Sequence, residues 1–232
     1  MKILMTGSAG KVGSTLVRGL RDRHDIRGYD LKPTPELDDS IVGDVSDFDA
    51  ISDATKGMDA VIHLGGIPGG AGLWKDILPS NFVGTYNVFE AARLHGVRRV
   101  AFASRAGLLG PYPRDVQRTV EMLPRPTSYY SVSKAYGESL AYMYVAQHDL
   151  EIVCVRIGNF SADRDQPEHP HHLSHGDAVR VFEQAVIHPG VTFEIVFGVS
   201  DSNWPLYDLD HGRRAIGYEP QDFADVPEDQ RD

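Results

Sequence analysis

The sequence predicts a doubly wound α/β fold, in which helices cover both faces of a parallel sheet. Short apolar runs alternate with amphipathic segments along the chain, a pattern typical of βαβ units. The first apolar run leads into a glycine-rich turn that opens a helix. The 232 residues suffice for one domain with a sizeable core, and no apolar run approaches the length that spans a bilayer.

The periodicity places the elements in order along the chain. We expect strands at 3–6, 26–30, 60–64, 100–103, 152–157 and 193–197. We expect helices at 12–23, 80–95, 130–147 and 178–185, the last after a start signature of Ser174 and Asp177. Residues 1–158 therefore form the main sheet domain. Residues 159–232 form a small region that ends in a solvated acidic tail, with Asp222, Asp225 and Asp232 among its carboxylates.

Charge and cysteine content exclude several classes of protein. A net charge of −10 argues against binding to nucleic-acid backbones and to anionic membranes. The single cysteine, Cys154, forms no intramolecular disulfide and indicates a reducing compartment. The N-terminus also lacks a signal-peptide layout, so we expect a cytoplasmic protein. Cys154 lies in an apolar run, which predicts an inert buried thiol.

The glycine-rich turn has the spacing G-x-x-G-x-x-G, formed by Gly7, Gly10 and Gly13. Such glycines allow a tight turn, a close approach of backbone to a pyrophosphate, and close packing of helix on strand. The helix that follows would point its N–H groups at the phosphates. Asp30 ends the next strand and can accept hydrogen bonds from the adenosine ribose. The turn therefore predicts a Rossmann fold that binds NAD in preference to NADP, although the nearby Lys32 leaves some tolerance of NADP.

Two further pairs are candidates for contact with the cofactor. Asp44 and Val45 follow a short apolar pair and could hold the adenine edge. Gly65 and Gly66 follow a buried strand and would let backbone run close to the cofactor.

Tyr130 and Lys134 are four residues apart on a predicted helix, so their side chains share one face. A free tyrosine has a pKa near 10 and is a poor base at neutral pH, but a neighbouring cation favours the phenolate. The pair could then remove a hydroxyl proton while hydride leaves the same carbon.

Together these features resemble the extended short-chain dehydrogenase/reductases, the NAD-dependent epimerase/dehydratase family. Within the family the chain looks most like uronate dehydrogenases and related sugar dehydrogenases. The resemblance is carried by segments 6–13, 63–67, 81–87, 102–104, 123–126, 130–134, 155–159, 173–175 and 217–220.

The resemblance implies roles for individual residues. Tyr130 would be the base, and Lys134 would hold the nicotinamide ribose and tune the tyrosine. The cofactor-binding set would be completed by Lys11, Val12, Leu64, Asn81 and Ile157.

The sequence departs from the family at the serine that would hydrogen-bond the reacting oxygen. An ungapped comparison places Arg105 at that serine, and Ser104 directly before it stays a catalytic candidate if the strand end shifts. In uronate dehydrogenases a substrate-binding Ser-Asn-His run starts at this position, and a substrate serine stands where this chain has Pro68. The candidate substrate contacts are Ile67, Pro68, Arg105, Ala106, Asn159 and His175.

The resemblance implies an NAD-dependent oxidoreductase that acts on a small sugar, either a uronic acid, an aldose or a sugar phosphate. The region after residue 158 is short for a nucleotide-sugar site, which favours a small substrate. A sugar epimerase or dehydratase with tightly held NAD is one alternative. A non-catalytic NAD-binding regulatory protein is another, which the missing serine supports.

Four histidines, at 169, 171, 172 and 175, lie close together in the sequence. The spacing of His171 and His175 would suit a metal if both lay on one helix. Ser174 looks like the helix N-cap, however, and leaves His171 in the loop. We therefore expect a polar loop on the substrate side and no metal.

The predicted helices at 80–95 and 130–147 carry aromatic residues beyond a single core-facing stripe, including Phe89, Tyr136 and Tyr144. Related proteins commonly pair these two helices into a four-helix interface. The resemblance therefore implies a homodimer.

Overall fold

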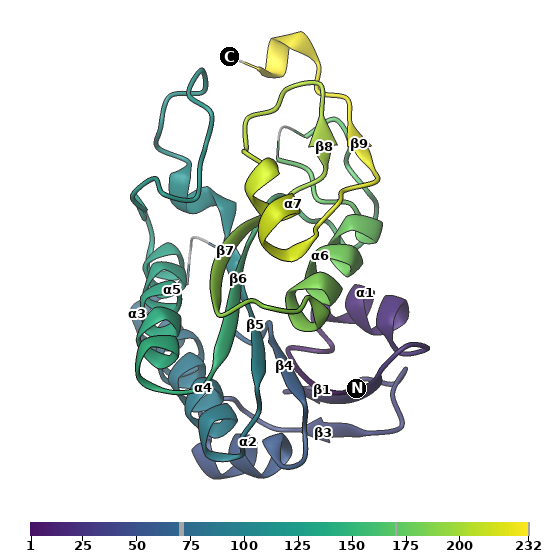
Figure 1. Ribbon diagram of the computed structural model, residues 1–232, viewed down its shortest axis with the longest axis vertical. Helices are drawn as coiled ribbons and strands as arrows, with labels where there is room; N and C mark the ends of the chain where they lie inside the picture. The colour runs from purple at the N-terminus through teal and green to yellow at the C-terminus, as the bar shows by residue number, and fades with distance from the viewer. Residues whose placement is uncertain (70–71, 170, 232) are drawn as a thin grey trace.

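The computed structural model describes residues 1–69, 72–169 and 171–231. Seven parallel strands form one sheet in the order β3-β2-β1-β4-β5-β6-β7 (Figure 1). The strands are β1 (Lys2–Thr6), β2 (Asp25–Asp30), β3 (Ser40–Val42), β4 (Ala60–His63), β5 (Arg99–Arg105), β6 (Glu151–Ile157) and β7 (Phe193–Gly198). The strand order reverses at β1 and β4, and a crevice forms at the carboxyl ends of the strands at such a point. The predicted doubly wound fold is confirmed.

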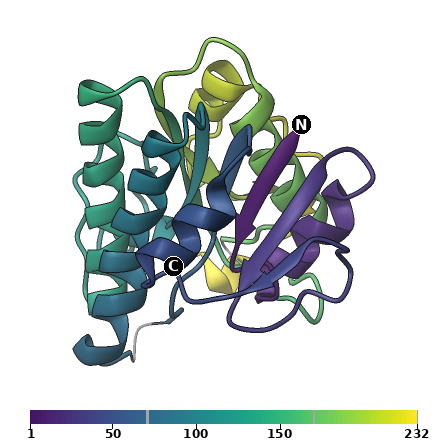
Figure 2. The same cartoon turned by 90° about the horizontal axis from the view of Figure 1, so that it is seen from below.

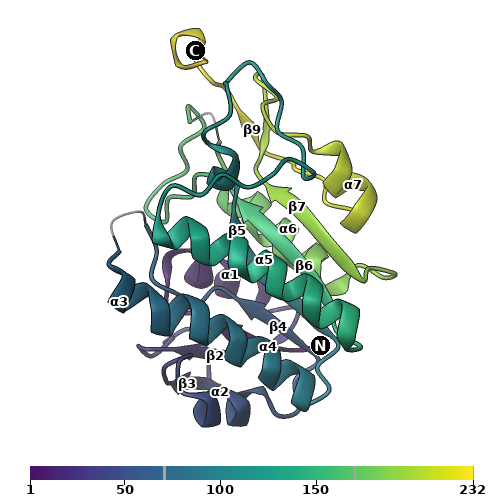
Figure 3. The ribbon, with the colours of Figure 1, turned by 90° about the vertical axis from the view of Figure 1, so that its left-hand side faces the viewer.

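Helices cover both faces of the sheet, and Figure 2 shows the sheet between the two helix layers. One face carries α1 (Lys11–Leu20) and α6 (His175–Ile187). The other carries α2 (Phe48–Thr55), α4 (Gly84–Leu94) and α5 (Tyr129–Gln147). Figure 3 shows α4 and α5 side by side across that second face.

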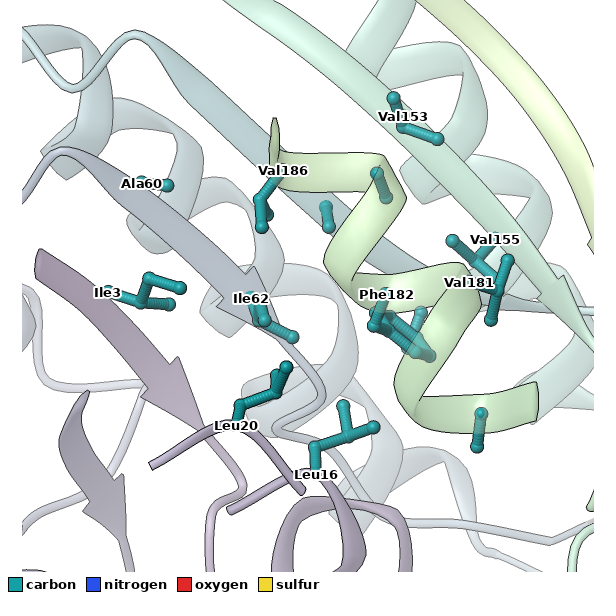
Figure 4. Close-up of a cluster of buried hydrophobic side chains, with 14 of the residues drawn as sticks. Ile3, Leu16, Leu20, Ala60, Ile62, Val153, Val155, Val181, Phe182 and Val186 are labelled. Carbon is teal, nitrogen blue, oxygen red and sulfur yellow. The ribbon is translucent and has the colours of Figure 1, made fainter. Parts of the chain in front are cut away.

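Alternating strand residues supply a core on each face of the sheet. Ile3 of β1 packs with Leu16 of α1 and Phe182 of α6 (Figure 4), whereas the intervening Leu4 packs under α2 and α4. Cys154 on β6 is fully buried in the second core, and burial raises the pKa of its thiol well above the usual value. The predicted burial of Cys154 is confirmed.

Side-chain hydrogen bonds cap the N-termini of α5 and α6. Ser128 accepts a hydrogen bond from the Ser131 N–H at the start of α5. The predicted start signature of α6 is confirmed, because the Ser174 hydroxyl accepts from the Asp177 N–H at 2.9 Å.

β3 and α2 are not among the elements that the sequence predicts, and the helix expected at 80–95 is more complex than predicted. The chain there forms the short α3 (Trp74–Ile77), then a π-helix, η1 (Leu78–Val83), and only then α4. β3 has three half-exposed or exposed residues, so it lacks the apolar alternation that identifies a strand.

Two elements after residue 158 complete the sheet domain. α6 packs in the first core and β7 pairs with β6, so the expected boundary at residue 158 lies inside one βαβ unit. A smaller cap follows, built from β8 (Asp201–Ser202), α7 (Asp210–Ile216), β9 (Phe223–Ala224) and η3 (Glu228–Gln230). The cap reaches the loop after β5 and its 3₁₀ turn η2 (Ala106–Leu109), because the Arg118 N–H donates to the Leu206 carbonyl at 2.7 Å.

The predicted solvated tail is partly wrong. Asp222 is docked on the start of α6, where it accepts from the Ser174 hydroxyl at 2.6 Å and pairs with Arg180 at 3.0 Å. Asp225 accepts from the Asn203 amide. Asp232 lies outside the described residues. Local charge counting misses these partners because they come from distant segments.

None of the described helices combines the length and the apolar character needed to cross a membrane.

Candidate active site

A cavity of about 820 Å³ lies at the carboxyl ends of the strands. The glycine-rich loop and Asp30 line one end of it, and Tyr130 and Lys134 line the other. Its place at the reversal of strand order is where open α/β sheets bind their ligands.

The glycine-rich loop forms a cradle that side chains would fill. Gly7 has a φ of +71°, a left-handed conformation that favours glycine. A Cβ at Gly13 would lie 2.1 Å from the Gly7 carbonyl oxygen, so the helix packs on the strand only without a side chain. A Cβ at Gly10 would meet only that same oxygen, at 3.1 Å. The loop therefore presents bare backbone at the start of α1, which fits the pyrophosphate of a dinucleotide.

Asp30 is held beside this loop by two backbone groups. Its carboxylate accepts hydrogen bonds from the N–H groups of Ala9 and Lys32, each at 3.1 Å. Asp44 and Val45 line the same end of the cavity, and the Asn87 amide donates to the Val45 carbonyl at 3.0 Å. The fixed carboxylate is placed to accept the ribose hydroxyls and to repel a 2′-phosphate.

Replacing Asp30 with Ala should weaken NAD binding by about 1–2 kcal/mol, because charge-assisted hydrogen bonds to the ribose are lost. Titration of the protein with NAD and with NADP measures both affinities. Asp38→Ala removes a nearby exposed charge that does not line the cavity and should change neither. Tighter binding of NADP than of NAD by the unaltered protein would contradict the assignment.

A chain of buried hydrogen bonds supports the loop that carries Gly65. The Gly65 N–H donates to the Thr6 hydroxyl at 3.1 Å, and Thr6 contacts His63 Nδ1 at 2.7 Å. His63 Nε2 lies 3.2 Å from the Thr85 hydroxyl, which donates to the Asn81 carbonyl. A neutral His63 protonated at Nε2 satisfies all these bonds, with Nε2–H donating to Thr85 and Nδ1 accepting from Thr6. Burial, with Lys134 nearby, accordingly lowers the pKa of His63 to about 3.

Acid should therefore destabilise the fold through His63. The unfolded histidine binds a proton near pH 6.5 but the folded one only near pH 3, so stability falls as the pH drops below about 6.5. Between pH 7.5 and pH 5 the loss from this residue should be about 2 kcal/mol. Urea unfolding of the unaltered protein and of His63→Asn, each at both pH values, measures the contribution of His63 to the pH dependence of stability. The same pH dependence in both proteins would show that His63 does not carry it.

Tyr130 and Lys134 lie one turn apart on α5 at the other end of the cavity. The Lys134 side chain is almost fully buried, and its Nζ lies 5.5 Å from the centre of the Tyr130 ring. Burial lowers the pKa of Lys134 to about 8, and the charge of Arg105 pushes it the same way. Burial raises the pKa of Tyr130, and the Arg105 guanidinium opposes that rise.

The Ser104 hydroxyl is hydrogen-bonded to Glu138 and not to Tyr130. Its hydroxyl donates to Glu138 Oε1 at 2.6 Å, and the same carboxylate pairs with the buried Arg156 at 2.9 Å. The predicted catalytic role of Ser104 gains no support, because its proton is committed to Glu138. Arg105 instead extends beside Tyr130, and its Nη1 donates to the Ser131 hydroxyl at 3.1 Å.

All but two of the predicted site residues line this cavity. Asn81 instead holds the backbone of the loop after β4. Its Oδ1 accepts from the Ile67 N–H at 2.8 Å, and its Nδ2 donates to the Ile67 carbonyl at 3.2 Å. His175 lies outside the cavity, where its Nε2 contacts the Ser161 carbonyl at 2.6 Å. The predicted residues that line the cavity are Gly7, Gly10, Lys11, Val12, Gly13, Asp30, Asp44, Val45, Leu64, Gly65, Gly66, Ile67, Pro68, Ser104, Arg105, Ala106, Tyr130, Lys134, Ile157 and Asn159.

The structure adds residues that sequence reasoning did not assign. His169 and His171, expected only as part of a polar loop, line the substrate end together with Tyr207. The rings of His171 and Tyr207 are 5.3 Å apart. No sequence signal marks Tyr207, because it reaches the cavity from the cap. In the described part of the chain, no group of three or more His, Cys, Asp or Glu residues is arranged to hold a metal ion.

Comparisons with known proteins agree with this geometry. The model of the NAD dependent epimerase/dehydratase family matches residues 3–186. The NAD-dependent glucose-6-phosphate dehydrogenase of Haloferax volcanii is 36% identical over 95% of this chain and 93% of its own length. The uronate dehydrogenase of Pseudomonas putida is 34% identical over 97% of this chain and 85% of its own.

A solved structure shows the same fold. A tyrosine-to-alanine mutant of uronate dehydrogenase from Agrobacterium tumefaciens, complexed with NAD, superposes with a TM-score of 0.88. The two sequences are 32% identical, and the match covers 96% of this chain and 85% of that one. The chain belongs to the NAD dependent epimerase/dehydratase family. The predicted family and the predicted cofactor, NAD, are confirmed.

Proposed function

We propose that the protein is an NAD-dependent dehydrogenase that oxidises a hydroxyl of a small sugar, with Tyr130 as the base. The observation that carries the proposal is that Tyr130 and Lys134 open into the same cavity as the glycine-rich loop and Asp30. NAD bound along this cavity supplies the acceptor for the hydride that leaves the substrate carbon.

Side chains of the protein remove the proton of the substrate hydroxyl. Tyr130 as phenolate takes the proton of the substrate hydroxyl, and the Arg105 guanidinium lowers the pKa of Tyr130 against the effect of burial. The nearby Lys134, when charged, also favours the phenolate. His63 supports the turn that follows β4 through the buried hydrogen-bond chain and takes no part in proton transfer.

The relatives support a small sugar as the substrate. By their names, they act on glucose 6-phosphate and on uronates. The substrate end of the cavity is lined by polar groups that can bind sugar hydroxyls, among them Asn159, His169 and Tyr207.

The test is a screen for NADH formation with uronic acids, aldoses and sugar phosphates. Accumulation of NADH with one of these classes supports the dehydrogenase. Conversion of a sugar without net NADH, by protein that retains one NAD per chain after purification, would instead establish an epimerase or dehydratase. NAD binding without turnover of any sugar would favour the regulatory alternative.

We further propose that the enzyme forms a homodimer through α4 and α5. Phe89 and Tyr144, expected at the interface, are buried in the core with their rings 5.9 Å apart, so that part of the expectation is wrong. Other apolar residues take their place on this surface: Val83, the last residue of η1 directly before α4, and Val132 of α5 are each 40% exposed. Apolar side chains on two adjacent helices form a face suited to isologous pairing.

Light scattering at micromolar concentration should give twice the 25.6 kDa mass of one chain. The double variant Val83→Glu/Val132→Glu should give a monomer, because four carboxylates would be brought into the apolar interface of the dimer. Leu123→Glu, at an exposed leucine in the loop before α5, is the matched control and should remain dimeric. A monomeric mass for the unaltered protein would contradict the proposal.

We place the enzyme in the cytoplasm, with a small molecule as its partner. The lone Cys154 is free and buried, as expected of a protein kept in a reducing compartment. The net charge of −10 argues against nucleic acid and anionic membranes as partners.

A further inference from the structure

Arg105 has a fixed position beside the base. Its Cζ lies 5.3 Å from the centre of the Tyr130 ring. Its Nη1 donates to the buried Ser131 hydroxyl, which in turn lies 3.0 Å from the hydroxyl of Ser128. A Cβ at Gly107 would come within 2.3 Å of Arg105 Nη2, so the guanidinium occupies space that a side chain at that position would need.

The surroundings of this guanidinium hold no counter-charge among the described residues that line the cavity. The carboxylates of the lining are Asp30 and Asp44, both at the adenosine end. Glu138 lies further along α5, where Ser104 and Arg156 occupy it. The positive charge of Arg105 is therefore available to a negative charge that develops beside Tyr130.

We propose that Arg105 is a catalytic residue whose guanidinium donates a hydrogen bond to the substrate oxygen that Tyr130 deprotonates. This inference rests on the proposed dehydrogenase function and names the donor for that reaction. The donor takes the place where the resemblance expects a serine hydroxyl. A guanidinium offers five donors and stays charged across the working range of pH, so its bond to an oxygen that gains negative charge is stronger than that of a hydroxyl.

The position of Arg105 favours this role over that of a distant anion clamp. Ser131 and the space at Gly107 hold the guanidinium next to the ring that removes the proton. Whatever it binds must therefore lie near the reacting carbon. A carboxylate or phosphate remote from that carbon in the sugar would instead meet other residues of the lining, which include His169.

Arg105 also provides a positive charge beside Tyr130 that does not vary with pH. The pKa of Lys134 is lowered to about 8, so this side chain loses its positive charge as the pH rises through that value. The Arg105 guanidinium stays charged at the same pH. Removing Arg105 should therefore shift the acidic limb of the rate profile to higher pH, because the phenolate would be harder to form. The titratable and charged groups at this end of the cavity, or directly behind it, include Arg105, Lys134, His63, Glu138, Arg156, His169, His171 and Tyr207.

The experiment compares Arg105→Gln, Arg105→Lys and Arg105→Ser with the unaltered enzyme. Glucose serves as a neutral substrate, and glucuronate and glucose 6-phosphate serve as anionic ones. Arg125→Gln is the matched control, since that arginine lies 3.8 Å over the Tyr112 ring, outside the cavity, and should leave the rates unchanged.

We expect Arg105→Gln to lower kcat by about 100- to 1,000-fold on every substrate that the enzyme oxidises, with NAD affinity unchanged. The acidic limb of its pH profile should move to higher pH, and Arg105→Lys should recover part of the loss. A loss confined to the anionic sugars would show that Arg105 holds an anion, and would overturn the proposal. So would a tenfold gain with Arg105→Ser, which would show that the arginine merely displaces a serine.

A second measurement needs no turnover. The ultraviolet absorbance of tyrosinate, titrated with NAD present and corrected with Tyr130→Phe, follows the ionisation of Tyr130 directly. In Arg105→Gln this ionisation should occur at higher pH, and an unchanged titration would overturn the proposal. If no sugar is oxidised by the unaltered protein, the proposed function fails, and this titration still decides whether Arg105 acts on Tyr130.

Discussion

Replacing Tyr130 with Phe should reduce kcat for sugar oxidation by about 100- to 10,000-fold, the range typical of a lost general base. The change removes the phenolic oxygen alone and keeps the ring, whose centre lies 5.3 Å from Arg105 Cζ and 5.5 Å from Lys134 Nζ. NAD affinity should stay within about twofold, because the glycine-rich loop and Asp30 lie at the other end of the cavity. Rates of NADH formation and NAD titrations on the same preparation measure both quantities.

The neighbouring tyrosine is a matched control. Tyr129 is exposed on the same turn of α5, and its ring contacts Trp74 at 5.4 Å rather than the cavity. Tyr129→Phe should therefore keep its activity. Full activity in Tyr130→Phe would mean that another group removes the proton, and the proposed mechanism would have to be abandoned.

Replacing Glu138 with Gln should lower the free energy of unfolding by about 3–5 kcal/mol, the range for breaking a buried ion pair by removing one partner. Glu138 and Arg156 have side chains only 5% and 2% exposed. The glutamine keeps one amide oxygen as an acceptor but carries no charge, so the Arg156 charge stays buried without a counter-charge, and the Val120 carbonyl, 3.3 Å away, is a further acceptor. Urea unfolding followed by circular dichroism measures the difference.

Two controls separate the lost ion pair from a general weakness of α5. The triple variant Glu138→Leu/Arg156→Met/Ser104→Ala removes every member of the buried cluster and should recover most of the stability, because no charge or hydroxyl is left unpaired. Asp53→Asn breaks an exposed pair with Lys56 and should leave the stability nearly unchanged. Equal losses in the single and triple variants would show that packing, not charge, explains the effect.

The strands and the cofactor loop were predictable because their signals are local. An apolar run followed by Gly7, Gly10 and Gly13 predicts a strand, a tight turn and a helix within a dozen residues. The structure forms this turn, with bare backbone where side chains would not fit. The spacing of Tyr130 and Lys134 likewise implies one helix face, and both side chains line the cavity. The short β3 lacks such a signal, because its residues are half-exposed or exposed.

At three of the predicted site residues the side chain already has a hydrogen-bond partner elsewhere in the chain. Asn81 looked like a cofactor contact but is used by the backbone of Ile67, and its position is set by a π-helix that periodicity does not reveal. His175 looked like a substrate contact but holds the loop at Ser161. Ser104 is a predicted catalytic residue, and its hydroxyl donates a hydrogen bond to Glu138.

The sequence by itself determined the class of fold and predicted the place of the dinucleotide and the proposed base, because each depends on residues within one turn or one strand end. It also showed that Arg105 stands where a serine is expected. Only the tertiary structure decided what that arginine faces. Folding brings β5, the first turn of α5 and the cap together, so Arg105 meets Tyr130 and Ser131 while Tyr207 closes the same end of the cavity. Contacts between segments so far apart depend on how the sheet, the helices and the cap pack in three dimensions, and no local pattern of residues encodes them.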